Sequence, residues 1–163
     1  MDYLSFIQSK VIRQREELAN TLSIWRFKGE KIVFTNGCFD LLHRGHVEYL
    51  AKAAALGTKL IIGLNTDASV RRLKGESRPV NDEEARALVL ASLSYTDKIV
   101  FFDEDTPLEL IRYIQPDLLV KGNDYRPEDI VGYDIVKAKG GEVITIPLTE
   151  GYSTTGLLDK IQH

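Results

Sequence analysis

The sequence predicts an α/β protein with a Rossmann-like, doubly wound, five-stranded parallel sheet and helices on both faces. Two observations support this fold. Apolar runs about as long as buried strands alternate five times with stretches of helical pattern. Such alternation favours βαβ units, and the right-handed crossover rule then makes a doubly wound sheet the expected result. Ligands of such sheets bind at the carboxyl ends of the strands, near the switch point.

The first element is an amphipathic helix, because apolar residues recur at roughly helical spacing among charged ones. These residues are Leu4, Ile7, Val11, Leu18 and Leu22. Gly29 ends the pattern, so we expect residues 1–28 to form an N-terminal helical extension and residues 29–163 the main domain. The apolar stripe, with Trp25 and Phe27, would pack on that domain or on a second copy, which makes a homodimer a hypothesis.

The next elements follow in order. A strand at 31–36 leads into a helix at 43–56, which Gly57 would cap. A second strand follows at 59–65. The segment 68–81 carries charge, Gly and Pro, and predicts a helical turn followed by a mobile loop.

Asn81 is a good N-cap for a helix at 82–93, which has acidic residues in its first turn. Thr106 would cap a helix that begins at Pro107. The remaining elements are strands at 98–102, 117–122 and 142–148, a mostly helical segment at 126–140 and a last helix at 153–161.

Length and composition indicate one globular domain. A chain of 163 residues buries roughly 70% of the surface that its unfolded form exposes. Hydrophobic residues make up 44% and charged residues 28%. The net charge is -3 without a long Lys/Arg run, which argues against a nucleic-acid partner but leaves room for a small anionic ligand.

Cys38 is the single cysteine, so no intrachain disulfide forms and a cytoplasmic location is expected. The N-terminus lacks the pattern of a signal peptide, and no stretch is apolar enough to span a bilayer. We therefore expect no membrane partner.

The first strand–helix junction carries the strongest chemical signal. Gly37 follows the strand and can adopt backbone shapes that other residues resist. Backbone N–H groups and the helix dipole favour an anion there. His43 and His46 share one helix face, and Gly45 between them leaves room for a bulky anion. Imidazole donors at a phosphorus centre could stabilise transition-state charge, and Asp40 could orient a neighbour or help hold a metal.

Other interpretations of this junction stay open. The histidines could be a surface pair without a role. Cys38, His43 and His46 are zinc-ligand types, but structural zinc needs a fourth ligand and the other histidine, His163, is terminal. A catalytic cysteine is weaker, since Cys38 fits a small buried hydrophobe. The G-x-G-x-x-G and Walker A motifs are absent.

The segment GCFDLLHRGH resembles the G-x-F-D-x-x-H-x-G-H signature of the HxGH nucleotidyltransferase superfamily. The resemblance implies that an acceptor phosphate attacks the α-phosphate of a nucleoside triphosphate and that pyrophosphate leaves. His43 and His46 would be catalytic and stabilise the transition state. The implied nucleotide-binding loop comprises Asn36, Gly37, Cys38, Phe39, Asp40 and Gly45.

Three further segments would complete the site. Ser153, Thr154 and Thr155 are N-cap candidates for the last helix, and a similar S-T-T segment in the superfamily meets the β- and γ-phosphates. Some cytidylyltransferase relatives carry an arginine five residues before that serine, where this chain has Leu148.

Cations cluster at Arg71, Arg72, Lys74 and Arg78, either as a solvated loop or as a clamp on pyrophosphate. Lys74 is similar to a family lysine and is expected to be catalytic. Arg86 matches a phosphate-directed arginine of relatives; otherwise it is an exposed cation paired with Asp82 or Glu83.

The strand at 117–122 ends in polar residues. They either bind the base or the sugar at the carboxyl end of the strand, or they only form a turn. Those assigned to nucleotide binding are Lys121, Asn123 and Asp124.

Residues from about 22 to 163 resemble the adenylyltransferase domain of bacterial heptose-phosphate enzymes, through segments such as KIVFTNGCFD and VKGNDY. That resemblance implies transfer of AMP from ATP to D-glycero-β-D-manno-heptose 1-phosphate by a nucleotidyltransferase domain at 29–163. Mg²⁺ would arrive with ATP, and no metal site made of protein ligands is expected. The alternatives are a cytidylyltransferase acting on glycerol 3-phosphate or a similar acceptor, and a non-catalytic nucleotide-binding module.

Overall fold

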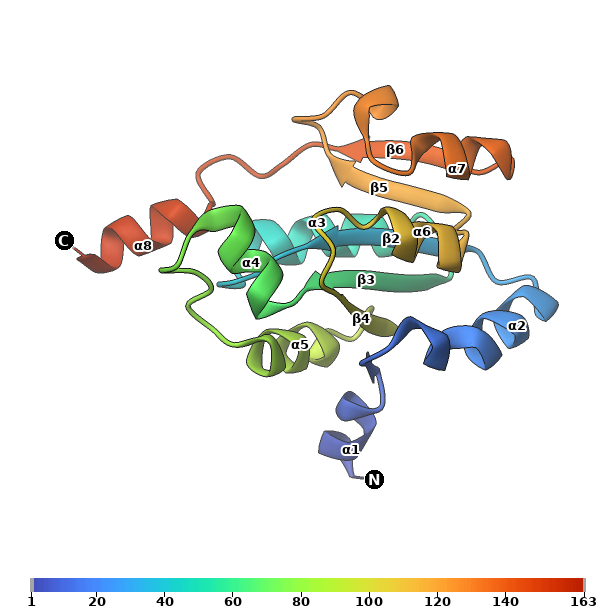
Figure 1. The fold of residues 1–163 in the computed structure, drawn as a ribbon, viewed down its shortest axis with the longest axis horizontal. Coiled ribbons are helices and arrows are strands. Elements are labelled where there is room, and N and C mark those ends of the chain that lie inside the picture. The colour runs from blue at the N-terminus through green and yellow to red at the C-terminus, as the bar shows by residue number, and fades with distance from the viewer. Residues whose placement is uncertain (1, 163) are drawn as a thin grey trace.

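The computed structural model describes residues 2–162 and contains a six-stranded sheet whose neighbouring strands all run parallel (Figure 1). Its order is β1-β4-β3-β2-β5-β6. The strands are β1 (Val11–Ile12), β2 (Ile32–Gly37), β3 (Lys59–Asn65), β4 (Lys98–Phe102), β5 (Leu118–Gly122) and β6 (Glu142–Ile146). The Rossmann-like α/β class is confirmed, whereas the predicted count of five strands is wrong.

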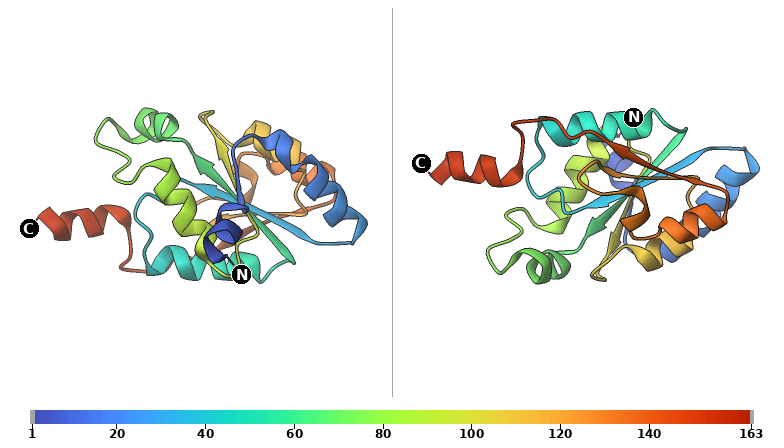
Figure 2. Two further views of the ribbon diagram at one scale, coloured as in Figure 1. Left: turned by 90° about the horizontal axis from the view of Figure 1, so that it is seen from below. Right: turned by 90° about the horizontal axis from the view of Figure 1, so that it is seen from above.

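Helices cover both faces of the sheet (Figure 2). The α-helices are α1 (Tyr3–Gln8), α2 (Ala19–Phe27), α3 (Arg44–Ala54), α4 (Asp67–Lys74), α5 (Glu83–Ser92), α6 (Leu108–Ile114), α7 (Tyr133–Ala138) and α8 (Thr154–Gln162). Two 3₁₀ turns, η1 (Arg15–Leu18) and η2 (Pro127–Asp129), complete the elements. One core cluster joins α3 and α5 to the sheet, and the other joins α2, α6 and α7 to its opposite face. Within residues 2–162, no helix has the length and apolarity that crossing a bilayer requires.

The sixth strand lies in the segment where one long helix was predicted. Val11 and Ile12 pair with Ile99 and Val100 of β4, because two adjacent β-branched residues fit an extended edge better than a helix. The helical pattern over Leu4–Leu22 is therefore broken into α1, η1 and the start of α2. The boundary between residues 1–28 and 29–163 stays a prediction, and Met1 and His163 lie outside the described residues.

Several predicted helix ends differ from those observed. Asp82, not Asn81, caps α5 by accepting a hydrogen bond from the Ala85 amide at 2.8 Å. Asn81 instead donates its side-chain amide to the carbonyl of Asp40 at 3.1 Å. The nominal cap of α6 is Pro107, so that helix starts one residue later than expected.

Gly57 does not cap α3, which ends with Ala55 in right-handed conformation. A Cβ at Gly57 would lie 2.6 Å from the Lys31 carbonyl oxygen, so the glycine allows the close approach of this turn to the chain entering β2. Gly132 has a φ of 91°, a left-handed conformation that divides the helix predicted at 126–140 into η2 and α7.

The sheet opens between β2 and β5, where the chain order switches direction. β2 pairs with β3 along its whole length, but its pairing with β5 is confined to Val33 and Phe34. The Tyr49 hydroxyl of α3 fills the opening: it lies 2.8 Å from Thr35 Oγ1 and donates to the Val120 carbonyl at 3.1 Å. This switch point is where a doubly wound sheet binds its ligands.

We expect Tyr49→Phe to lower the free energy of unfolding by about 1–3 kcal/mol, because a buried carbonyl and a buried hydroxyl lose their partner. Urea denaturation of the wild type and the variant measures this difference. Tyr113→Phe is the matched control, because the Tyr113 hydroxyl makes a long, exposed hydrogen bond of 3.5 Å to the Glu16 carbonyl. This variant should change the free energy of unfolding by less than about 0.5 kcal/mol. Equal losses in both variants would contradict the role given to Tyr49.

Candidate active site

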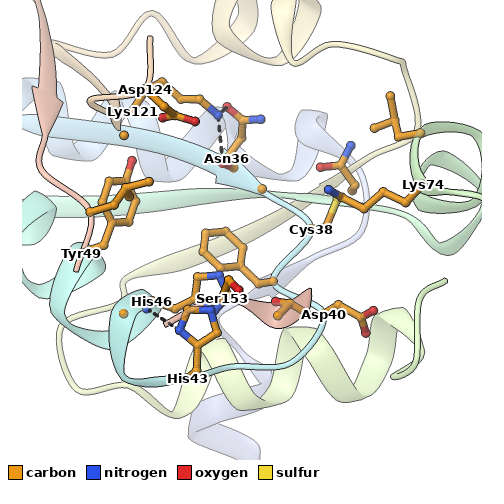
Figure 3. A pocket seen from close by; sticks show the side chains of 18 of the residues that line it. Asn36, Cys38, Asp40, His43, His46, Tyr49, Lys74, Lys121, Asp124 and Ser153 are labelled. Atoms are coloured by element: carbon orange, nitrogen blue, oxygen red, sulfur yellow. Dashed lines mark hydrogen bonds between the residues drawn. The ribbon is translucent and has the colours of Figure 1, made fainter. Parts of the chain in front are cut away.

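A cavity of about 690 Å³ opens at the carboxyl ends of the strands, at the switch point (Figure 3). Every residue that the sequence analysis assigned to the site lines this cavity except Arg86 and Asn123. The lining residues among those predictions are Asn36, Gly37, Cys38, Phe39, Asp40, His43, Gly45, His46, Lys74, Lys121, Asp124, Ser153, Thr154 and Thr155. The structure thus brings together residues more than a hundred positions apart in the chain.

The loop after β2 has a tightly specified shape. Phe39 has a φ of 45°, in the left-handed region that residues other than Gly, Asn and Asp rarely adopt. A Cβ at Gly37 would lie 3.0 Å from the Phe39 ring, and one at Gly45 would lie 3.0 Å from the His43 ring. These glycines therefore leave space that the neighbouring rings occupy.

The two histidine rings stack at the start of α3. Their centroids are 3.8 Å apart with an interplanar angle of 18°. His43 is the N-cap of α3, and its Nδ1 accepts the backbone N–H of His46 at 3.4 Å. A neutral His43 ring therefore carries its proton on Nε2, which leaves that N–H free as a donor.

Burial favours the uncharged form of both imidazoles. Burial, with a further contribution from His43 beside it, lowers the pKa of His46 to about 4. Burial also lowers the pKa of His43. Within residues 2–162, Nδ1 of His46 is buried without a hydrogen-bond partner. Two neutral rings can offer N–H donors to a developing negative charge without electrostatic repulsion between them.

Asp40 ties the loop after β2 to the segment before α5. Its carboxylate accepts hydrogen bonds from Arg78 Nε at 2.6 Å and from the backbone amides of Val80 and Asn81. Burial alone would raise the pKa of Asp40, but the two amides and the Arg78 guanidinium outweigh it and hold the pKa below its ordinary value. Although Asp40 lines the cavity, its oxygens are already engaged by protein donors.

Arg86 is buried and does not face the cavity, unlike the phosphate contact or exposed cation that its sequence position suggested. Its Nη1 donates to the carbonyls of Cys38 (2.7 Å) and Asn65 (2.9 Å). Nε donates to the Asn81 carbonyl at 3.1 Å, and Nη2 pairs with the Asp67 carboxylate at 2.8 Å. All three guanidinium nitrogens of Arg86 are therefore engaged by protein acceptors near the cavity.

Lys121 bridges the opening between β5 and β2. Its ammonium group donates to the backbone carbonyl and the side-chain oxygen of Asn36, both at 3.3 Å. Burial lowers the pKa of Lys121, partly opposed by the nearby Asp124 carboxylate. Asn123 points elsewhere, since its side-chain oxygen accepts the Leu148 amide at 3.4 Å.

Ser153 lies beside the histidines at the start of α8, which projects from the body of the molecule (Figures 1 and 3). Its Oγ accepts the Gly156 amide at 3.0 Å, as expected of an N-cap. The segment before it is anchored to α3, because Thr149 Oγ1 donates to Glu48 at 2.7 Å. Thr154 and Thr155 also line the cavity.

Sequence reasoning missed several lining residues, among them Tyr49, Asn65, Phe102, Asp105 and Tyr152. Asn65 and Phe102 end β3 and β4, so the rule that strand ends face the ligand could have identified them. Tyr49 carried no comparable signal, because an aromatic residue on an amphipathic helix predicts core packing.

No group of three or more His, Cys, Asp or Glu side chains converges on a possible metal position in residues 2–162. The zinc interpretation of Cys38, His43 and His46 gains no support from this arrangement, and His163 lies outside the described part.

Comparisons with known proteins agree on the kind of domain. A family model described as cytidylyltransferase-like matches residues 34–157. The bifunctional protein HldE of Syntrophotalea carbinolica is 57% identical over 150 residues, which cover 92% of this chain and 31% of the relative. HldE of Wolinella succinogenes is 57% identical over 151 residues, covering 93% of this chain and again 31% of the relative. The chain thus spans about a third of the length of these relatives.

Solved structures give the same picture of the fold. A lipopolysaccharide core biosynthesis protein from Thermoplasma volcanium aligns with a TM-score of 0.59 and 25% identity, covering 77% of this chain and all of the other. A pantoate-β-alanine ligase from Francisella tularensis, in complex with β-γ ATP and β-alanine, aligns with a TM-score of 0.61, covering 86% of this chain and 67% of that one. Its identity of 16% supports the fold alone.

The position of Arg86 leads to a prediction that separates a structural role from a phosphate contact. Arg86→Leu should lower the free energy of unfolding by about 3–5 kcal/mol, because it leaves Asp67 and three carbonyls without their donor. Urea denaturation checks this, with the exposed Arg112→Leu as the control. Unchanged stability together with weakened ATP binding would instead indicate that Arg86 contacts phosphate.

Proposed function

The chain belongs to the cytidylyltransferase-like family of nucleotidyltransferases, and from this premise we propose that it transfers AMP from ATP to D-glycero-β-D-manno-heptose 1-phosphate. The products would be ADP-heptose and pyrophosphate. The relatives named HldE and the Thermoplasma protein of lipopolysaccharide core biosynthesis support a sugar-nucleotide product. The chain matches 31% of each HldE relative, so the proposal concerns this portion only.

The observation that carries the proposal is the stacked pair of imidazoles at the N-terminus of α3. His43 and His46 line a cavity that is also lined by Ser153, Thr154 and Lys74. Transfer between two phosphate groups is favoured by this combination of fixed N–H donors, hydroxyls and a cation, and a helix N-terminus adds to the attraction for anions.

The reaction needs no covalent intermediate with the protein. An oxygen of the acceptor phosphate forms a bond to the α-phosphorus, and the bond from that phosphorus to the bridging oxygen of pyrophosphate breaks. His43 and His46 would donate hydrogen bonds to the α-phosphate oxygens as charge builds on them. The hydroxyls of Ser153 and Thr154 would hold the departing pyrophosphate. Catalysis would therefore consist of alignment and electrostatic stabilisation.

Mg²⁺ would enter with ATP as part of the substrate, where it neutralises charge on the triphosphate. The residues named above act by binding and orienting the two phosphates. Lys74 adds a positive charge at the cavity wall.

A substrate panel tests the proposal. The purified protein is incubated with ATP or CTP and with heptose 1-phosphate, glycerol 3-phosphate or ethanolamine phosphate, and pyrophosphate release is followed through a coupled pyrophosphatase. We expect release with ATP and heptose 1-phosphate. Release with CTP alone would replace the proposal by a cytidylyltransferase, and ATP binding without turnover on any acceptor would indicate a binding module.

His43→Ala and His46→Ala should each lower kcat by about 10²–10³, the usual effect of removing one well-placed donor. Steady-state kinetics with the productive pair of substrates measures the effect. His43→Ala also removes the cap of α3, so His43→Asn serves as the control because asparagine is a good N-cap. The Asn variant should regain the stability of the wild type but not its turnover. Wild-type turnover in both alanine variants would refute the catalytic role.

A further inference from the structure

The cavity extends to both sides of the loop after β2. Lys121 and Asp124 enter from the β5–β6 side, and Lys74 enters from the opposite side, next to Cys38 (Figure 3). The second side, at the ends of β3 and β4, is lined by Asn65, Leu73, Lys74, Phe102, Asp105 and Pro107. Nothing in the proposed transfer chemistry so far uses Asn65 or Asp105.

Asn65 has a fixed position and an unused acceptor. It ends β3 and is only 4% exposed. Arg86 Nη1 donates to the backbone carbonyl of Asn65 and also to that of Cys38. Asn65 therefore lies beside the loop after β2. These hydrogen bonds hold the backbone of the cavity wall at this point.

The hydrogen bonds of Ser69 orient the Asn65 side chain. Ser69 Oγ donates to the Glu104 carbonyl at 3.4 Å, so it accepts from Asn65 Nδ2 at 3.0 Å. The amide oxygen Oδ1 then points away from Ser69, and no donor in residues 2–162 reaches it. Because Asn65 lines the cavity, this oxygen is an acceptor that a ligand hydroxyl can reach.

Asp105 adds a second acceptor to the same wall. Arg72 Nε donates to its Oδ1 at 3.2 Å, which restrains the carboxylate and leaves Oδ2 available. Its side chain is 75% exposed, so no protein group covers it. Phe102, which is nearly buried, also lines this side and supplies an apolar surface. A wall with two acceptors and one aromatic surface suits a ligand rich in hydroxyl groups.

The direction of the displacement assigns this side to the acceptor. The attacking and leaving oxygens lie on opposite sides of the α-phosphorus in phosphoryl transfer. Ser153 lies beside the histidines, whereas Lys74 lies on the other side of Cys38 (Figure 3). If pyrophosphate leaves toward Ser153, the acceptor phosphate attacks from the side of Lys74, which supplies a positive charge for it.

Given the proposed function, we infer that the β3–β4 side of the cavity is the acceptor subsite and that Asn65 and Asp105 select a polyhydroxylated sugar phosphate. Asn65 Oδ1 and the Asp105 carboxylate accept hydrogen bonds from neighbouring hydroxyls of the sugar. Lys74 receives the phosphate. Glycerol 3-phosphate, which has fewer hydroxyls, satisfies these acceptors less well.

Calorimetry without turnover tests the inference directly. The protein is saturated with α,β-methylene-ATP, which cannot transfer AMP, and titrated with heptose 1-phosphate and, separately, glycerol 3-phosphate. The variants are Asn65→Leu, which keeps the side-chain volume, and Asp105→Ala, whose exposed site carries little folding risk. Asp103→Ala is the matched control, because Asp103 also pairs with Arg72 but does not line the cavity.

We expect each variant to weaken binding of heptose 1-phosphate about 10- to 100-fold, as the loss of a hydrogen bond in a binding site does. Binding of glycerol 3-phosphate should change less, and binding of the ATP analogue should not change. The Asp103 control should bind all ligands like the wild type.

The outcomes separate this inference from the proposed function. Unchanged sugar-phosphate binding in both variants, with ADP-heptose formed by the wild type in the substrate panel, would overturn the subsite alone. A wild type that releases pyrophosphate only with CTP and glycerol 3-phosphate would overturn the function and the subsite with it. A loss of ATP-analogue binding in Asn65→Leu would assign Asn65 to the nucleotide instead.

Discussion

The separation of β2 from β5 is the constraint on which the active site depends. Backbone pairing between these strands stops after Phe34, while β2 and β5 keep their other neighbours to the end. The gap exposes strand-end carbonyls that need donors, and Tyr49 and Lys121 supply them. Because burial raises the pKa of Tyr49 to about 12, its hydroxyl remains a donor across the physiological range. An apolar filling of the gap would leave those carbonyls unsatisfied.

Two buried ionic groups then hold the loop after β2 in its unusual shape. Arg86 fixes the carbonyl of Cys38, and Asp40 binds the amides of Val80 and Asn81. Between them stands Phe39 with its positive φ, a conformation that surrounding contacts must maintain. The histidines follow within a few residues, so the same contacts set where the imidazoles lie. A preorganised loop of this kind needs little rearrangement when charge develops on a bound phosphate.

Local patterns predicted the fold class and much of the site, and non-local contacts account for the rest. The buried strands are continuous apolar runs, and β3 and β4 have the predicted bounds. The motif at the end of β2 spans only ten residues, so its side chains lie near one another because they are close in the sequence. Arg86 could not be placed in this way, because its partners are backbone groups of residues 38, 65 and 81, brought together only by the fold. A two-residue strand such as β1 is too short to leave a periodic signature, and Asn65 has no local signal apart from its position at a strand end.

Strand β1 has a consequence for any attempt to shorten this domain. It pairs with the outer edge of β4, where the Lys10 carbonyl also accepts the Ile99 amide at 2.9 Å. The residues that follow bury Leu18 and Leu22 against the cluster that contains Val100 and Phe102. Removing residues 1–28 would uncover an apolar strand with free backbone donors and acceptors, the usual template for intermolecular β-pairing and aggregation. The N-terminal segment therefore covers the edge of β4 that such pairing would need.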